Sequence, residues 1–160
     1  MTHRLASPQD LESIYDLYME ESANPYLTYD SMSKQDFTSI YDKLVKTETV
    51  FIVENEGAII ATYRLIPKTD RQAHTVYLGG FTIKRDFQGK GFGIKILDHI
   101  KANASEQHKI RIELTVDILN AAAIALYKKG GFIVEGQIRK SYRRSDTHDY
   151  YDEYLMAFLL

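Results

Sequence analysis

The chain has 160 residues, of which 44% are hydrophobic and 26% are charged, which suits one globular domain over residues 1–160. Its formal net charge of −2 argues against nucleic acid or an anionic membrane as a partner. The absence of cysteine excludes disulfides, thiolate metal ligands and a cysteine nucleophile, and it favours a cytoplasmic location. No apolar run approaches the roughly 20 residues of a membrane span, and the acidic N-terminus is unlike a signal peptide.

The N-terminal segment predicts one strand and two helices. The strand covers Thr2–Ala6. Ser7 followed by Pro8 is typical of a helix start, and apolar residues at helical spacing extend this helix to about Glu21. After a loop, Ser33 is placed to cap a second helix.

The rest of the chain predicts a three-strand meander, followed by strands and helices in the order α-β-α-β-β. The predicted strands are VFIVE, AIIATYRLI, HTVYLGGFTIK, KIRIELTV, FIVEGQI and YYDEYLMAFLL. One amphipathic helix follows QGKGFG, which we expect directly after the third of these strands, and AAAIALYKK forms another. The order β-α-α-β-β-β-α-β-α-β-β predicts an α/β fold, with a mixed central sheet of about seven strands and helices on both faces. The apolar C-terminal strand is expected at a sheet edge, where it would favour a homodimer.

The stretch QGKGFG predicts an anion site at a helix N-terminus. It consists of Gln88, Gly89, Lys90, Gly91, Phe92 and Gly93. Glycines let a ligand approach the main chain, and the free N–H groups of a helix start attract phosphate or pyrophosphate. The stretch matches neither the Walker A pattern nor the dinucleotide fingerprint GxGxxG. An ordinary tight connection is the alternative.

Asn120 and Tyr127 lie seven residues apart on one predicted helix and therefore face the same way. The strand before them, Lys109–Val116, is expected to run parallel to the strand that feeds the glycine stretch. Adjacent parallel strands that end at helix N-termini form the crevice where α/β proteins bind ligands. The alternative for this pair is a helix cap and a half-buried tyrosine.

Together these residues resemble the GCN5-related N-acetyltransferase (GNAT) family, which transfers acetyl from acetyl-CoA to amines. FTIKRDFQGKGFG resembles its Q/R-x-x-G-x-G/A motif, and NAAAIALYKKGGF resembles its Asn–Tyr helix. The element order is similar over the whole chain. RIELTV, YKKGGFIVEG and DEYLM look most like bacterial L-amino-acid N-acetyltransferases. Spermidine acetyltransferases and the alanine acetyltransferases of ribosomal proteins are also similar.

The resemblance implies a site for acetyl-CoA. The strand residues Phe81, Thr82 and Ile83 would pair with the pantetheine arm, in a sheet that splays between strands four and five. Residues 88–93 would wrap the pyrophosphate, and Asn120 would hydrogen-bond the pantetheine arm. Tyr127 would lie near the thioester sulfur, where a hydroxyl can act as the general acid for the departing thiolate.

The sequence also bears on the mechanism. With no cysteine and no GxSxG motif, direct transfer in a ternary complex is expected. Some relatives place a Glu base where this chain has Thr115. Glu113 could act as a base through water, and a strand carboxylate without a catalytic role is the favoured alternative. The histidines show no ligand spacing, so no metal is predicted.

The acceptor is expected to be a small-molecule amine, with an amino acid as the first hypothesis. Tyr26 and Tyr29 lie on the predicted acceptor loop, and Arg64, Arg139 or Arg143 could bind a carboxylate. The acidic run from Asp146 to Asp152 would instead suit a polyamine, and a protein N-terminus is a further alternative. A non-catalytic acyl-CoA-binding module is less expected, because the chain shows no further domain for it to regulate.

Overall fold

The computed structural model describes residues 1–160. The predicted α/β class and order of elements are confirmed, with four short 3-10 turns added. The strands form a mixed seven-stranded sheet in the order β1-β2-β3-β4-β5-β7-β6. The chain divides into two compact units, which are described separately. Unit 1 contains Met1–Leu65 and Gly80–Phe87, and unit 2 contains Ile66–Gly79 and Gln88–Leu160.

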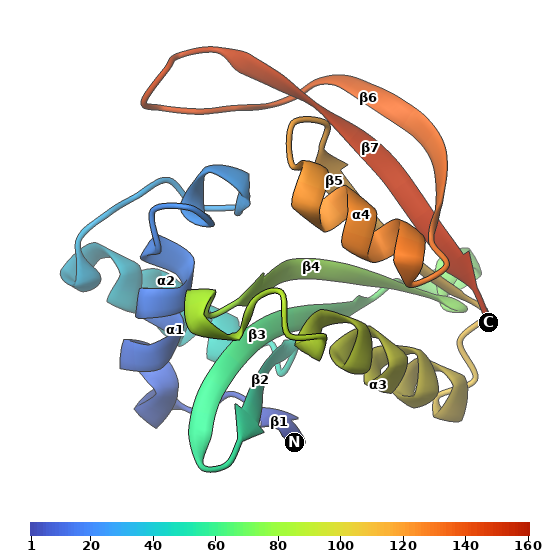
Figure 1. The fold of residues 1–160 in the computed structure, drawn as a ribbon, viewed down its shortest axis with the longest axis horizontal. Coiled ribbons are helices and arrows are strands. Elements are labelled where there is room, and N and C mark those ends of the chain that lie inside the picture. Colours follow the sequence, from blue (N-terminus) through green and yellow to red (C-terminus); the bar gives the residue numbers. More distant parts are fainter. The chain divides into compact units, whose positions relative to one another are not determined.

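Unit 1 combines an antiparallel strand trio with two helices (Figure 1). Its elements are β1 (Thr2–Leu5), α1 (Leu11–Met19), α2 (Lys34–Val45), β2 (Val50–Asn55) and β3 (Ala58–Pro67, whose last two residues belong to unit 2). Its core consists of Ile14, Tyr18, Phe37, Tyr41, Leu44, Val50 and Ile52. Ser33 caps α2 as predicted, because its Oγ accepts a hydrogen bond from Asp36 N at 3.2 Å. The three-residue spacing of Ser33 and Asp36 in the sequence was therefore enough to identify the start of this helix.

The first helix differs from its prediction at both ends. Residues Pro8–Asp10 form a 3-10 turn, and α1 ends at Met19. Asp10 explains the turn, because its carboxylate accepts hydrogen bonds from Ser7 N and Oγ, both at 2.8 Å. The same carboxylate binds the Arg4 guanidinium through two hydrogen bonds of 2.9 Å. These hydrogen bonds fix the conformation of the segment that connects β1 to α1.

Unit 2 contains the remaining strands and helices. Its elements are β4 (Thr75–Ile83, of which Gly80–Ile83 belongs to unit 1), α3 (Phe92–Glu106), β5 (Arg111–Asp117), α4 (Ala121–Lys129), β6 (Ile133–Arg143) and β7 (Tyr150–Leu159). Strands β6 and β7 form a long hairpin (Figure 1). None of the helices in the structure has the length and apolar character needed to cross a membrane.

The ladder between β4 and β5 is short, as the predicted splay requires. It pairs only Thr75–Tyr77 with Arg111–Glu113, in parallel. Strand β5 nevertheless continues to Asp117, and all seven of its residues pair with β7. The β4-facing edge of β5 thus lacks a strand partner from Leu114 onward.

The prediction of an apolar C-terminal edge strand is wrong. β7 lies between β5 and β6, and both of its edges are hydrogen-bonded. The edge strand is β6, which is largely exposed and carries charged residues such as Glu135, Arg139 and Lys140. Charged edge strands resist pairing with another chain. Strand β7 therefore offers no free edge through which a homodimer could form.

Candidate active site

The glycine-rich stretch forms an open loop at the start of α3. Gly89 and Gly91 have φ angles of 71° and 83°, in the left-handed region that favours glycine. A Cβ atom at either position would meet nothing within 4 Å, so the backbone is open to an approaching group. The helix begins at Phe92, inside the stretch. One prediction is corrected: the turn Arg85–Phe87 follows β4, so the loop does not follow the strand directly.

This loop has the properties of an anion site. The first N–H groups of a helix have no partner inside the helix and lie at the positive end of its dipole. Gly91, the N-cap residue of α3, has no side chain that could satisfy them. Lys90 is exposed next to it and adds a positive charge. The residues present therefore fit a pyrophosphate held by main-chain N–H groups.

Asn120 caps α4, as predicted. Its Oδ1 accepts a hydrogen bond from Ala123 N at 3.1 Å, and its own N–H donates to Asp117 O at 2.9 Å. The cap uses only the oxygen of the side-chain amide. The Nδ2 group makes no hydrogen bond within the protein, so it can donate to a carbonyl group of a ligand.

Tyr127 is a buried tyrosine on α4, only 7% exposed. Its ring contacts that of Phe132, with centroids 5.7 Å apart. The helix end approaches α3 closely, because a Cβ at Gly130 would lie 2.8 Å from Leu97 Cδ1. Burial, and secondarily the neighbouring Tyr77 hydroxyl, raise the pKa of Tyr127 well above its ordinary value. The hydroxyl therefore stays protonated at neutral pH, as a general acid requires.

Tyr77 is a candidate that the sequence did not reveal. Its hydroxyl lies 2.8 Å from Thr115 Oγ1 and so links β4 to β5 just beyond their last paired residues. The only signal in the sequence was that Tyr77 and Gly79, two residues apart, share one face of the strand. This does not predict the contact of Tyr77 with Thr115, which lies 38 positions away.

Glu113 lies within a cluster of ion pairs. It contacts the Lys68 ammonium, and Arg111 Nε lies 3.0 Å from its carboxylate. Arg111 also binds Glu135 through two hydrogen bonds. Burial raises the pKa of Glu113, but the hydrogen bonds from Lys68 and Arg111 outweigh it and leave the pKa below its ordinary value. A carboxylate with two cationic partners and a lowered pKa is a weak base.

The strand segment that the resemblance assigns to the pantetheine arm lies in unit 1. Thr82 is buried, whereas Phe81 and Ile83 are partly exposed. Lys84 N donates to Ile60 O at 2.8 Å, which fixes the end of this segment. Just before it, Gly80 has a φ of 55°, and a Cβ there would lie 2.3 Å from the Tyr18 hydroxyl oxygen. Glycine is therefore required where α1 meets this strand.

The residues proposed for the acceptor loop differ in their surroundings. Tyr29 packs against Tyr18 and Phe37, with ring centroids 6.1 and 6.3 Å away, and Tyr26 is 40% exposed. Asn24 Nδ2 ties the loop down by donating to Tyr18 O and to Tyr29 O. Tyr29 is thus largely a packing residue, and Tyr26 remains accessible.

Arg64 occupies an unusual environment on β3. Its Nη2 lies 3.4 Å from Thr49 Oγ1, and its buried Nε has no hydrogen-bond partner. No carboxylate pairs with it. A partly buried guanidinium without an anion is unfavourable. Such a group is a candidate for binding the anionic part of a ligand.

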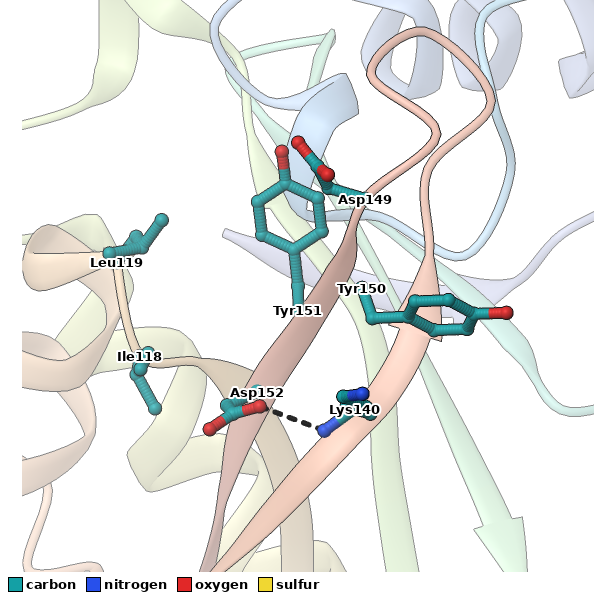
Figure 2. Close-up of a pocket in the computed structure, with 7 residues that line it drawn as sticks. All are labelled: Ile118, Leu119, Lys140, Asp149, Tyr150, Tyr151 and Asp152. Atoms are coloured by element: carbon teal, nitrogen blue, oxygen red, sulfur yellow. Dashed lines mark hydrogen bonds between the residues drawn. The ribbon is translucent and has the colours of Figure 1, made fainter.

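The β6–β7 hairpin borders a pocket of about 520 Å³, which we call the hairpin pocket (Figure 2). It is lined by Ile118, Leu119, Lys140, Asp149, Tyr150, Tyr151 and Asp152. Asp152 accepts hydrogen bonds from Lys140 N at 2.8 Å and from Gln137 Nε2 at 2.7 Å. The carboxylates and the tyrosine rings together give this pocket both charge and aromatic surface.

Neither predicted arginine of the hairpin lines this pocket. Arg143 Nε donates to His148 O at 3.2 Å, and its guanidinium lies over the Tyr150 ring. Arg139 is exposed and helps to lower the pKa of Asp152, after the hydrogen bonds from Lys140 and Gln137. The structure also shows no cluster of three or more His, Asp or Glu side chains that could hold a metal ion.

Comparison with known proteins identifies the family. The model of the acetyltransferase (GNAT) family matches residues 11–132, about three quarters of the chain. The chain belongs to the GNAT acetyltransferase family. A curated relative, the probable spermine N(1)-acetyltransferase of Bacillus subtilis subsp. natto, is 35% identical over 88 residues. That match covers 52% of this chain and 58% of the relative, so the chain spans little more than half of its curated relative's length.

Two solved structures share the fold over nearly the whole chain. The spermidine N-acetyltransferase of Vibrio cholerae, in complex with CoA and spermine, has a TM-score of 0.82 at 23% identity, covering 99% of this chain and 94% of that one. The ribosomal-protein-alanine N-acetyltransferase of Brucella melitensis has a TM-score of 0.80 at 19% identity and covers both chains fully. The special likeness to L-amino-acid acetyltransferases is not confirmed, since the curated relative is a spermine acetyltransferase.

Proposed function

We propose that this protein is an N-acetyltransferase that transfers acetyl from acetyl-CoA to a primary amine of a small molecule, directly and within a ternary complex. The observation that carries the proposal is the glycine loop at the start of α3 in a chain of the acetyltransferase family. Its two left-handed glycines leave the main chain open to a pyrophosphate. Acetyl-CoA supplies the activated acetyl group as a thioester.

Three parts of the chain would bind this donor. Residues 88–93 hold the pyrophosphate through main-chain N–H groups and Lys90. Asn120 donates from Nδ2 to a pantetheine carbonyl, because its Oδ1 is already used to cap α4. The segment Phe81–Ile83 pairs with the pantetheine arm as an added strand would. A main-chain N–H near Ile83 polarises the thioester carbonyl.

Tyr127 acts as the general acid of the transfer. The neutral amine attacks the thioester carbon, the carbon–sulfur bond breaks, and the electron pair goes to the sulfur. A bond forms between the amine nitrogen and the acetyl carbon, and Tyr127 gives its hydroxyl proton to the thiolate. The amine nitrogen loses its proton to solvent, and the Tyr127 oxygen takes a proton back from solvent. Its raised pKa keeps the hydroxyl protonated until the transfer occurs.

Glu113 is a poor candidate for the base, because Lys68 and Arg111 already stabilise its negative charge. Without a strong base, the rate depends on the fraction of amine that is neutral. The α-amine of a peptide, with a pKa near 8, is partly neutral at pH 7.5, whereas an amine with a pKa of about 10.4 is almost fully protonated. We therefore expect the rate with a polyamine to rise up to about pH 10, and that with the alanine-start peptide to level off near pH 8.

A polyamine is the first candidate acceptor. The curated relative is named as a probable spermine N(1)-acetyltransferase, and its name supports this class. The hairpin pocket adds Asp149 and Asp152 beside the rings of Tyr150 and Tyr151. Carboxylates and aromatic faces are the groups that bind aliphatic ammonium ions.

An amino acid is the second candidate, because of Arg64. Its charge has no carboxylate partner in the protein, and its Nε has no acceptor. A substrate carboxylate would supply both. Arg64→Gln should then raise KM for an amino acid by about 10- to 100-fold, as the loss of a charge-assisted contact implies, without changing KM for a polyamine.

The test is a thiol-release assay with acetyl-CoA and one acceptor at a time. The chain has no cysteine, so every thiol detected is coenzyme A. Spermidine, L-phenylalanine, L-methionine and an alanine-start peptide are compared at equal concentration, each amino acid alongside its carboxamide. Faster turnover of spermidine than of the other amines supports a polyamine as the acceptor. Faster turnover of the free amino acids than of their carboxamides supports an amino-acid acceptor whose carboxylate binds Arg64. Tight binding of acetyl-CoA with no turnover of any amine would overturn the proposal in favour of an acyl-CoA-binding module.

A further inference from the structure

Asp117, the last residue of β5, carries a buried carboxylate and is only 4% exposed. No Lys, Arg or His side chain pairs with it. A buried charge without a cation is unfavourable unless hydrogen-bond donors stabilise it. The two donors that this carboxylate has are therefore important to the part of unit 2 around it.

The two oxygens of Asp117 bind two different segments. Oδ1 accepts a hydrogen bond of 2.6 Å from Leu119 N, in the connection between β5 and α4 (residues 118–120). Oδ2 accepts a hydrogen bond from the Tyr142 hydroxyl, on β6. Strand β7 lies between β5 and β6, so the Tyr142 side chain reaches across a whole strand to make this contact. One carboxylate thereby joins the connection to the hairpin.

These two segments are also the two walls of the hairpin pocket. Ile118 and Leu119 come from the connection, and the other lining residues come from the hairpin on the opposite side (Figure 2). A second contact between the walls is the hydrogen bond of 3.2 Å that Ile118 N donates to Asp152 O. Neither Asp117 nor Tyr142 lines the pocket. Their bond therefore joins the walls from outside the space that a ligand would fill.

Tyr142 follows a bulge in β6, where residues 139–141 lie opposite Asp152 alone. Extra residues of this kind bend a strand and change the direction of the side chains near them. Beyond the bulge, the Tyr142 ring stacks on that of Tyr151, with centroids 5.5 Å apart and an interplanar angle of 24°. Tyr151 lines the pocket. Tyr142 thus contacts a pocket residue with its ring and the Asp117 carboxylate with its hydroxyl.

We propose that Asp117 and Tyr142 are positioning residues, which hold the two walls of the hairpin pocket at the separation that the acceptor amine requires. The inference rests on the proposed function, because it takes this pocket as the acceptor site. Neither residue touches the acceptor or the thioester. Their bond orders the hairpin before the acceptor arrives, which lowers the entropic cost of binding. Loss of the bond should weaken acceptor binding and leave the chemical step unchanged.

The first test removes the Tyr142 hydroxyl. Tyr142→Phe keeps the ring and should raise KM for the acceptor by about 3- to 10-fold, as the loss of one hydrogen bond implies, while kcat and KM for acetyl-CoA stay within about 2-fold. The acceptor used is whichever of spermidine, L-phenylalanine, L-methionine and the alanine-start peptide the wild type turns over fastest.

Ser141→Ala is the matched control for this test. The Ser141 hydroxyl also donates to a carboxylate, that of Glu153 at 2.5 Å, but this bond stays within the hairpin and does not join the two walls. Ser141→Ala should therefore leave kcat and both KM values unchanged. An acceptor KM that does not rise in Tyr142→Phe, or that rises equally in both variants, would overturn the proposal.

Variants of Asp117 form a graded second test. Asp117→Asn keeps an oxygen for Leu119 N, and its amide group can donate to the Tyr142 oxygen, so the acceptor KM should rise less than in Tyr142→Phe. Asp117→Ala removes the bonds to both walls and should raise it more. Adding Tyr142→Phe to Asp117→Ala should have no further effect, because the bond is already lost. Effects that multiply would show that the two residues act independently, against the proposal.

Hydrogen exchange separates this inference from the proposed function, because it requires no activity. Amides of residues 143–150, beyond the bond to Asp117, should exchange faster in Tyr142→Phe than in the wild type, and at the wild-type rate in Ser141→Ala. If the wild type acetylates no amine but this difference is seen, the proposed function fails and the bond's role in holding the hairpin stands. If the wild type is active, and Tyr142→Phe speeds exchange without raising the acceptor KM, the inference fails alone.

Discussion

The glycine loop and the tip of the β6–β7 hairpin, which we propose as binding surfaces for the donor and the acceptor, are built in two different ways within unit 2. The loop depends on backbone conformation: Gly89 and Gly91 are left-handed, and no side chain fills the space beside them. The hairpin depends on side chains. Its charges cancel, since the acidic residues Asp146, Asp149, Asp152 and Glu153 equal in number the basic residues Arg139, Lys140, Arg143 and Arg144. In the proposed function the pyrophosphate is the same whatever the acceptor, whereas the acceptor itself can vary, and only the loop has a recognisable motif.

The largest expected effect comes from changing the loop. Gly91→Val places a β-branched residue at a φ of 83°, which its side chain strongly disfavours. Affinity for acetyl-CoA, measured by calorimetry, should fall by at least about 100-fold, with every acceptor affected equally. Gly136→Val is the matched control, because Gly136 lies on exposed β6 without a positive φ. Unchanged affinity in a folded Gly91→Val protein would remove the loop from the donor site.

The second-largest effect is expected from Tyr127, whose loss should slow the chemical step with every acceptor. Tyr127→Phe should lower kcat by about 10- to 1000-fold while affinity for acetyl-CoA stays within a few-fold, because it removes the proton donor. Tyr41→Phe is a control in unit 1. That buried hydroxyl donates to Ser7 O at 2.7 Å, so its loss should lower stability and leave kcat unchanged. If kcat survives in Tyr127→Phe, water protonates the thiolate.

A change in the hairpin should affect one class of acceptor. Asp149→Asn removes a charge from the hairpin pocket and should raise KM for spermidine by about 10-fold, without changing KM for acetyl-CoA. Asp146→Asn is the control, because Asp146 is paired with Arg144 on the same hairpin and does not line the pocket. Equal effects of the two changes would mean that the pocket does not contact the acceptor.

The smallest effect on catalysis is expected from Asp10, which belongs to neither region. Arg4, together with Ser7, lowers the pKa of Asp10 to about 2. A lowered carboxylate pKa stabilises the fold above the ordinary pKa near 4, and that contribution is lost as the pH falls toward 2. Asp10→Asn should therefore cost about 2 kcal/mol of unfolding free energy at pH 7 and leave kcat unchanged. Urea unfolding at pH 7 and pH 3 measures this, and the difference between the variant and the wild type should shrink at pH 3.

The sequence predicted the features that depend on local patterns. Ser33 and Asn120 cap their helices with the expected side-chain oxygens, because a cap involves residues three positions apart. The element order followed from hydrophobic periodicity. The loop glycines were recognised because positive φ angles leave a signature in the amino-acid type itself.

Features that depend on distant contacts could not be predicted. The sequence suggested that β7 would be an edge, but it inserts between β5 and β6, and strand order is not encoded in neighbouring residues. Strand β6 also extends to Arg143, because Tyr142 and Arg143 pair with the start of β7. The bond between Tyr77 and Thr115 joins residues 38 positions apart. The roles of side chains in the acceptor site could not be predicted either, because they too depend on contacts between residues that are distant in the sequence.

The proposed function requires that acetyl passes directly from acetyl-CoA to an amine. Mass spectrometry of both the amine and the intact protein, after a short incubation with acetyl-CoA and spermidine, tests this most directly. We expect an acetylated amine that forms only when the protein is present, and no acetylated form of the protein at any time. No acetylated product from any small amine, or an acetylated protein that appears before the product, would contradict the account.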